Sequence, residues 1–170
     1  MNANNLIRHG LVCGALLTFL FYLPLLIVGP TPGFMKWGEL VGYTTMFVVM
    51  SAAAIAMRAE RDRAGAISFT RAFFLGCGVS AIAALIFGVA TWVFYMVSGE
   101  AWSQAIYDFY LKNAGGDPKR IAELEANKAF FYNYPLQAAV MFATVFMIGV
   151  VESIIGAWWF SRRGARQPAN

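Results

Sequence analysis

Long apolar stretches alternate with short polar ones along the chain, and four of the apolar stretches are long enough to cross a bilayer. A helix needs about 20 residues to span the hydrocarbon core of a membrane. The four stretches cover residues 10–28, 40–57, 72–97 and 136–160. They predict four transmembrane helices within a single membrane domain, residues 1–170.

The composition agrees with this pattern. Apolar residues make up 59% of the chain and charged residues 13%, whereas soluble domains have about 45–50% and about 25%. A small soluble domain has too much surface for its volume to bury so many apolar side chains, but a bilayer accommodates them. We therefore expect an all-α integral membrane four-helix bundle.

Basic residues predict how the bundle is oriented. Cytoplasmic segments carry an excess of Lys and Arg near the ends of spans. The basic residues on one side are Arg8, Arg58, Arg61, Arg63, Arg71, Arg162, Arg163 and Arg166. Those on the other side are Lys36, Lys112, Lys119, Arg120 and Lys128, most of them in a long segment that also carries acids. Both termini and the basic loop 58–71 are expected in the cytoplasm.

The segment 98–134, between the third and fourth spans, is expected outside the cytoplasm and partly helical. Its apolar residues recur at helical spacing on both sides of a glycine-rich break. Asp117 followed by Pro118 predicts the start of the second of two amphipathic helices. Their apolar stripes are suited to lie on the outer leaflet, to cap the bundle, or to contact a partner.

Small residues repeat at four-residue spacing on three of the predicted spans. Helices in lipid associate through close van der Waals contact, which small side chains permit. The rows are Gly10 and Gly14; Gly76, Ser80, Ala84 and Gly88; and Gly149, Ser153 and Ala157. We expect them to pack within the bundle, and a seam between two copies of the chain is the alternative.

Glu152 is the one charged residue well inside a predicted span. It lies about eight residues from the cytoplasmic end, or roughly 12 Å deep at 1.5 Å per residue. A carboxylate at that depth is costly and is a candidate functional group by default. Either it serves proton or cation coupling, or it is a protonated carboxyl that hydrogen-bonds to a Ser, Thr or backbone carbonyl of a neighbouring helix.

The basic loop 58–71 has two interpretations. Its arginines, Arg58, Arg61, Arg63 and Arg71, are explained by membrane orientation, and the sharper alternative is a docking surface for anionic lipid or a cytoplasmic protein. Ser68 is expected to cap the third helix, with Phe69 entering it. Glu39 is expected at the start of the second helix, where the helix dipole favours it, and Tyr43 at the membrane interface.

Part of the chain resembles a known family. The stretch 38–46, Gly-Glu-Leu-Val-Gly-Tyr-Thr-Thr-Met, resembles the entry to the second helix of a bacterial membrane family catalogued as domain of unknown function 4199. The family's loop pattern is similar to the residues from Arg58 to Gly76. The family-like residues are Glu39, Gly42, Tyr43, Ser68 and Phe69. The resemblance implies a bacterial inner-membrane protein of four helices and implies no activity.

The expected function follows from what the polar residues do not form. There is no nucleophile with a base, no acid–base pair, and no Cys/His cluster for a metal, so we expect neither an enzyme nor a cofactor. We predict a non-enzymatic structural or regulatory membrane subunit that acts through helix packing and protein or lipid contacts. The alternative is an oligomeric small-solute or proton-coupled transporter or channel that uses Glu152. The expected partners are membrane lipids and either a second copy of the chain or another membrane protein, but not nucleic acid.

Overall fold

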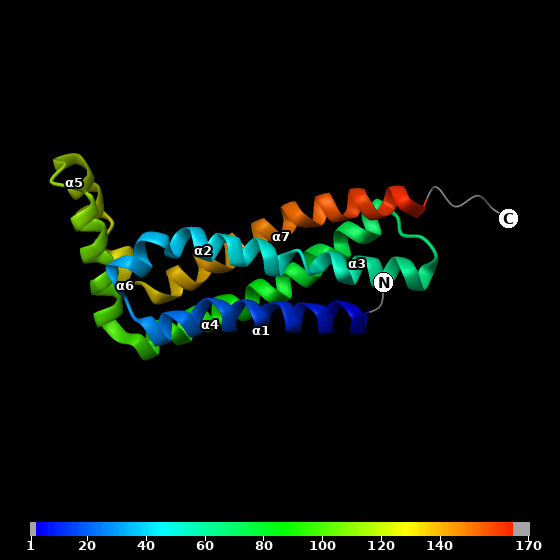
Figure 1. Ribbon diagram of the computed structural model, residues 1–170, viewed down its shortest axis with the longest axis horizontal. Helices are drawn as coiled ribbons and strands as arrows, with labels where there is room; N and C mark the ends of the chain where they lie inside the picture. The colour runs from blue at the N-terminus through cyan, green and yellow to red at the C-terminus, as the bar shows by residue number, and fades with distance from the viewer. Residues whose placement is uncertain (1–2, 165–170) are drawn as a thin grey trace.

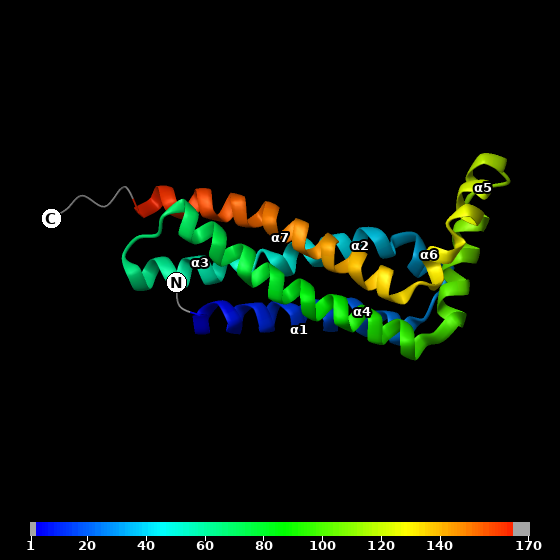
Figure 2. The same cartoon turned by 180° about the vertical axis from the view of Figure 1, so that it is seen from behind.

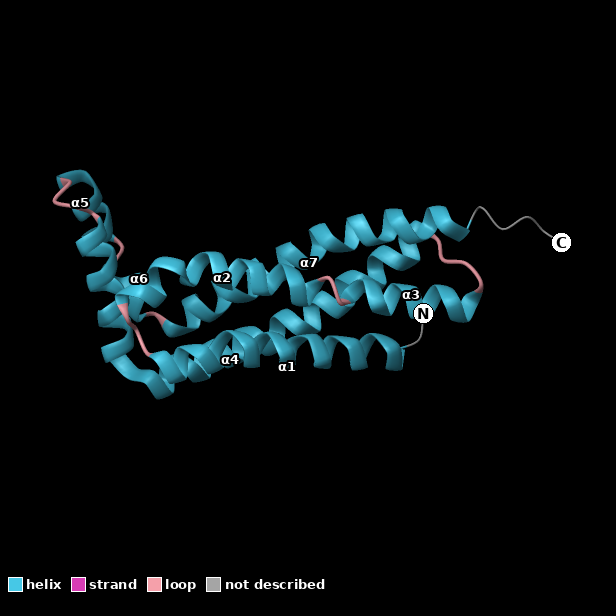
Figure 3. Ribbon diagram, viewed as in Figure 1, coloured by secondary structure: helices cyan, strands magenta, loops and turns pink. Residues whose placement is uncertain are grey.

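The structure, a computed structural model, describes residues 3–164 and contains seven helices in that range (Figures 1 and 3). They are α1 (Ala3–Val28), α2 (Pro32–Met50), α3 (Ala53–Ala64), α4 (Phe69–Asn113), α5 (Pro118–Ala126), α6 (Lys128–Tyr132) and α7 (Tyr134–Gly164). No strand occurs among the described residues, so the predicted all-α class is confirmed. Arg166, which contributes to the predicted orientation, lies outside the described residues.

Four helical stretches are long and apolar enough to cross a membrane: α1, residues 35–64 of α2 and α3, α4, and residues 134–162 of α7. They lie lengthwise beside one another (Figures 1 and 2). The α3–α4 connection lies with the start of α1 and the end of α7 at one end of the bundle. We call this the basic end; α5 and α6 lie at the opposite end, the arm end.

The second span is interrupted, although the sequence predicts one continuous helix over 40–57. Ser51 and Ala52 separate α2 from α3, and the amides of Ala52, Ala54 and Ile55 bond to carbonyls three residues back rather than four. The Ser51 hydroxyl donates to the Phe47 carbonyl at 2.8 Å. Such back-bonding by a serine inside a helix is a common cause of bending.

The predicted basic loop 58–71 is wrong over its first half. Helix α3 continues to Ala64, so Arg58, Arg61 and Arg63 lie on its last two turns. The connection to α4 is only residues 65–68, and it begins at Gly65 with φ of +76°. The sequence prediction fails here because the charged run has good helix formers and no breaker before the glycine.

Helix α4 bends sharply at Gly99, whose φ of +67° and ψ of −169° are not helical. Only glycine adopts this conformation readily, so the apolar part of α4 ends there and the chain turns aside. Residues 100–132, the rest of α4 with α5 and α6, form what we call the arm (Figure 1). Within it Asp117 caps α5 by accepting from the Lys119 amide at 3.0 Å.

Two matching Gly-x-x-x-Ser segments join α4 to α7. Ser80 donates to the Gly76 carbonyl at 2.8 Å, and Ser153 donates to the Gly149 carbonyl at 2.6 Å. A Cβ added at Gly76 would collide with Ser153, and one added at Gly149 would collide with Ser80. Each serine therefore satisfies its hydroxyl within its own helix and occupies the space that the glycine opposite leaves free.

The other small-residue rows lie in comparable places. A Cβ on Gly10 or Gly14 would lie 2.7 Å from the side chain of Ile82 or Ile86, so these glycines let α1 approach α4. The fully buried alanines of the rows are Ala84 and Ala157. Since all of these contacts lie between helices of one chain, the rows are used for packing inside the bundle.

We predict that Gly149→Leu and Gly88→Leu each destabilise the protein by about 1–3 kcal/mol, the usual cost of overpacking. A Cβ added at Gly88 would lie 3.2 Å from the Phe142 side chain, and one added at Gly149 would lie 2.5 Å from Ser80 Cβ. The measurement is thermal unfolding in detergent.

The matched controls are Val89→Leu and Val151→Leu, whose side chains are about half exposed on the outside of the same helices. Both valine variants should have the same melting temperature as the unchanged protein. Equal melting temperatures for the glycine and valine variants would show that the α4–α7 contact is not tight.

Candidate functional site

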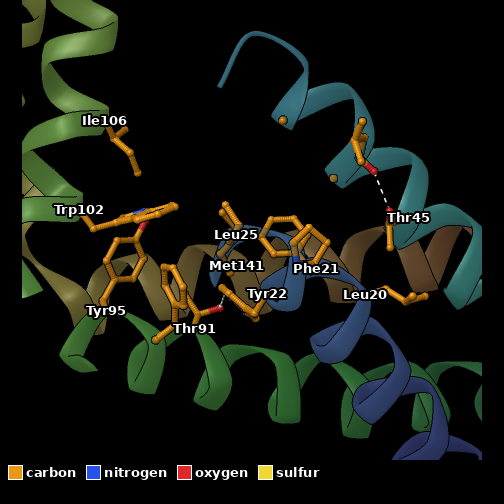
Figure 4. A pocket seen from close by; sticks show the side chains of 15 residues that line it. Leu20, Phe21, Tyr22, Leu25, Thr45, Thr91, Tyr95, Trp102, Ile106 and Met141 are labelled. Atoms are coloured by element: carbon orange, nitrogen blue, oxygen red, sulfur yellow. Dashed lines mark hydrogen bonds between the residues drawn. The ribbon is translucent and has the colours of Figure 1, made fainter. Parts of the chain in front are cut away.

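The bundle is hollow at the arm end. Two adjoining hollows, of about 180 and 370 Å³, lie between α1, α2, α4 and α7, and we call them together the α2 cavity. Figure 4 shows the smaller of the two. The residues that line both hollows are Phe21, Gly38, Gly42, Tyr95, Ile106 and Met141.

The cavity exists because the first half of α2 stands away from the other helices. None of the residues 33 and 35–41 is buried, whereas Gly42, Met46, Val49 and Met50 are. A Cβ on Gly42 would lie 2.8 Å from the ring of Phe21, so the glycine sets the point where α2 first meets α1. Helix α2 is thus packed into the bundle mainly through its second half.

The wall of the cavity is apolar and aromatic. Tyr22, Phe94 and Trp102 form a run of ring contacts, with centroids 4.8 Å and 5.1 Å apart. Two tyrosine hydroxyls at the wall are paired: Tyr22 with Thr91 at 2.5 Å, and Tyr95 donating to Gln137 at 3.1 Å. Because these polar atoms have partners, the surface left to a ligand is mainly hydrocarbon.

Glu39 and Tyr110 stand at the edge of the cavity. The Tyr110 hydroxyl donates to Glu39 Oε1 at 2.6 Å and so ties α2 to the arm. Glu39 was expected at the helix start, but α2 begins at Pro32, two turns earlier, so that placement is wrong and the helix dipole does not account for Glu39. The family-like residues Glu39, Gly42 and Tyr43 all line the larger hollow.

A buried acid organises the basic end. The Glu60 side chain is 1% exposed, and it accepts from Arg71 at 2.6 Å and from Arg63 at 3.1 Å. This joins the last turn of α3 to the first turn of α4, whose cap, Ser68, accepts from the Arg71 amide at 3.4 Å. The role of Glu60 was not predicted from the sequence, although its i,i+3 spacing to Arg63 is a signal of such a pair.

The other two arginines of the predicted loop pair with a different acid, Asp62. Arg61 pairs with its neighbour Asp62 at 2.6 Å, and Arg58 lies 3.6 Å from the same carboxylate. Phe69, at the start of α4, is 42% exposed. The four arginines are therefore divided between two that pair with the buried Glu60 and two that pair with the exposed Asp62.

Glu60 belongs to the helical stretch 35–64, but it lies after the apolar part of that stretch, 40–57, among the charged residues of its last two turns. Burial raises the pKa of its carboxyl, but hydrogen bonds and positive charge from Arg63 and Arg71 lower that pKa by more. The net result is a pKa below the ordinary value of 4.5. The folded protein therefore stabilises the ionised carboxylate.

Glu152 is half-buried on α7, and its carboxyl contacts the side chain of Ser51, at the break between α2 and α3. Among the described residues it makes no ion pair with Lys or Arg. The contact with a serine of a neighbouring helix is the arrangement that a structural carboxyl requires.

The described residues also contain no group of three His, Cys, Asp or Glu side chains that could hold a metal ion.

The comparison with protein families gives one match. A model described as "Protein of unknown function (DUF4199)" matches residues 8–162. This confirms the resemblance that the segment 38–46 and the residues Arg58–Gly76 carry. No curated protein and no solved structure matches the chain.

We predict that Glu60→Gln lowers the melting temperature in detergent at neutral pH. Its folded-state pKa is below the unfolded value of 4.5, so the stabilisation is present above pH 4.5 and is lost as pH falls through the folded pKa. The gap in melting temperature between the unchanged protein and the variant should shrink as pH falls below 4.5. Glu125→Gln, at an exposed site, is the control; a gap that does not change with pH would contradict the ion-pair explanation.

Proposed function

The chain belongs to the family of proteins of unknown function DUF4199, and we propose that it is a non-enzymatic structural or regulatory subunit of a bacterial inner membrane. It acts through helix packing and through contacts with lipids and with another membrane protein. Its termini and the α3–α4 connection face the cytoplasm. The excess of basic residues at that end supports this orientation.

The arm is the observation that carries the proposal. It leaves the bundle at Gly99 and projects beyond the four spanning helices (Figure 1). Helix α5 has no buried residue, although Ile121 and Leu124 form an apolar stripe along one side that is only half covered. An ordered amphipathic helix that the bundle does not bury is a surface suited to a partner.

The arm is also held in a defined position. Tyr132 donates to Gln104 at 2.5 Å, and the Lys128 ammonium lies 5.2 Å from the ring centroid of Tyr107. These two contacts fix the internal shape of the arm, and the bond from Tyr110 to Glu39 holds the arm against α2. A preorganised surface lowers the entropic cost of association, which supports docking rather than passive exposure.

The arrangement of polar side chains supports a non-enzymatic role. The buried acid, Glu60, is committed to two arginines, and the hydroxyls at the α2 cavity are committed to Thr91 and Gln137. A general base or nucleophile has to reach a substrate, and these groups are occupied in holding helices together.

We predict that the full-length protein, purified from its native membrane in mild detergent, is part of a heteromeric complex of fixed stoichiometry. Ile121→Asp and Leu124→Asp should remove the partner, because each puts a charge on the apolar stripe of α5. Native mass spectrometry measures the stoichiometry, and thermal unfolding shows that the bundle is intact.

Ala122→Asp is the matched control, since it adds the same charge to an exposed position of α5. It should keep the partner. A chain that is found only as monomer or homo-oligomer, or a complex that survives both stripe variants, would refute the proposed role of the arm.

A second function, an oligomeric proton-coupled transporter, is favoured by one observation. The helix break at Ser51 lies beside Glu152 in the same bundle. Interrupted helices next to an acid at membrane depth are typical of ion sites in transporters.

Proton flux into proteoliposomes distinguishes the two functions. On the subunit proposal, we expect neither the unchanged protein nor Glu152→Gln to conduct protons above the level of protein-free vesicles. The variant keeps the size and hydrogen bonds of the side chain but cannot ionise. Flux through the unchanged protein that is lost in the variant would establish transport instead.

A further inference from the structure

We propose that the α2 cavity binds one hydrocarbon chain of a membrane lipid whose head group carries a primary ammonium, with the ammonium at Glu39. Phosphatidylethanolamine has this chemistry. This proposal adds a ligand and a binding site to the proposed function. It rests on the proposed function in one respect only, that the protein spans a membrane. It does not require a partner on the arm.

The size and lining of the cavity suit a flexible chain. Small-molecule sites have volumes of roughly 300–1,000 Å³ and mostly apolar walls with a few polar groups. The larger hollow has about 370 Å³, and the smaller one extends it past Phe21 toward Leu20 and Pro24. Figure 4 shows Ile106 and Trp102 facing α1 and α2 across the space.

The cavity is open to the side of the bundle. Its larger hollow is lined by Tyr43 on α2 and Val140 on α7, which are 52% and 41% exposed. Residues that line a cavity and are exposed as well mark an opening, and one opening therefore lies between α2 and α7. In a bundle that spans a bilayer this opening faces lipid, so the membrane itself supplies the ligand.

Glu39 selects the head group. It directly precedes the apolar stretch 40–57, at the level where the acyl chains of a lipid meet its head group. Its Oε1 accepts from Tyr110, and among the described residues the carboxylate makes no ion pair with Lys or Arg. An ammonium is complementary to this carboxylate, whereas an anionic head group is repelled.

The test is native mass spectrometry of the full-length, delipidated protein titrated with phosphatidylethanolamine or phosphatidylglycerol of identical chains. The protein should bind one phosphatidylethanolamine with an affinity about tenfold higher than for phosphatidylglycerol, the size of effect expected for one charge-assisted hydrogen bond. Glu39→Gln should reduce this preference to near unity. Equal binding of the two lipids by the unchanged protein would overturn the proposal.

Ile106→Trp fills the cavity and should reduce the binding of both lipids by about tenfold or more. Ile155→Trp makes the same exchange at an exposed position of α7 and should leave binding unchanged. Equal binding by the two variants would overturn the proposal. So would a dimer or a bound partner that Ile106→Trp removes, since the occupant would then be protein.

A second measurement needs no variant. Phosphatidylethanolamine with a photoreactive group at the end of one chain should label the cavity residues Phe21, Trp102 or Met141 in the unchanged protein. Labelling confined to the outer faces of α1 and α7 would overturn the proposal. Because both assays are made on the purified protein without a partner, loss of the lipid site is distinguishable from loss of a partner complex.

Discussion

The contact between α4 and α7 is the interaction on which the rest of the structure depends. Lipid tails are as apolar as leucine, so helices in a bilayer gain little from burying apolar side chains and must instead fit closely. Gly76 and Gly149 let the two helices approach, and Ser80 and Ser153 fill the space without leaving a hydroxyl unpaired. The other helices pack on this pair: α1 packs on α4, and the Met50 side chain at the end of α2 reaches the α4–α7 contact beside Gly149.

Much of the fold could be predicted from the sequence, because its signals are local. Apolar length locates the spans, and four-residue spacing of small residues locates the packing rows. The break at Ser51 and the true end of α3 at Ala64 could not be located in this way. Serine, alanine and arginine are compatible with a continuous helix, so the break depends on a side-chain bond and the end depends on a glycine.

The candidate site was harder to predict, for a different reason. The segment Gly38–Tyr43 was recognised by its resemblance to a family. A cavity beside this segment forms only where the neighbouring helices do not pack against it. That depends on the approach of Gly42 to Phe21, on the bend at Gly99 and on the position of α7, which lie far apart in the chain. Glu60 is similar: its partner Arg71 is eleven residues away, across a turn.

The hydrogen bond between Tyr110 and Glu39 connects two regions that otherwise touch little, the free half of α2 and the arm. Glu39 holds the arm with the same carboxylate that stands at the mouth of the α2 cavity. A ligand that draws this carboxylate away weakens the hold on the arm, and a partner that reorients Tyr110 releases Glu39 toward the ligand. Where the lipid and the partner both bind as proposed, thermodynamic reciprocity requires that each change the affinity of the other by the same factor, and this single bond would then make the arm responsive to the surrounding lipid.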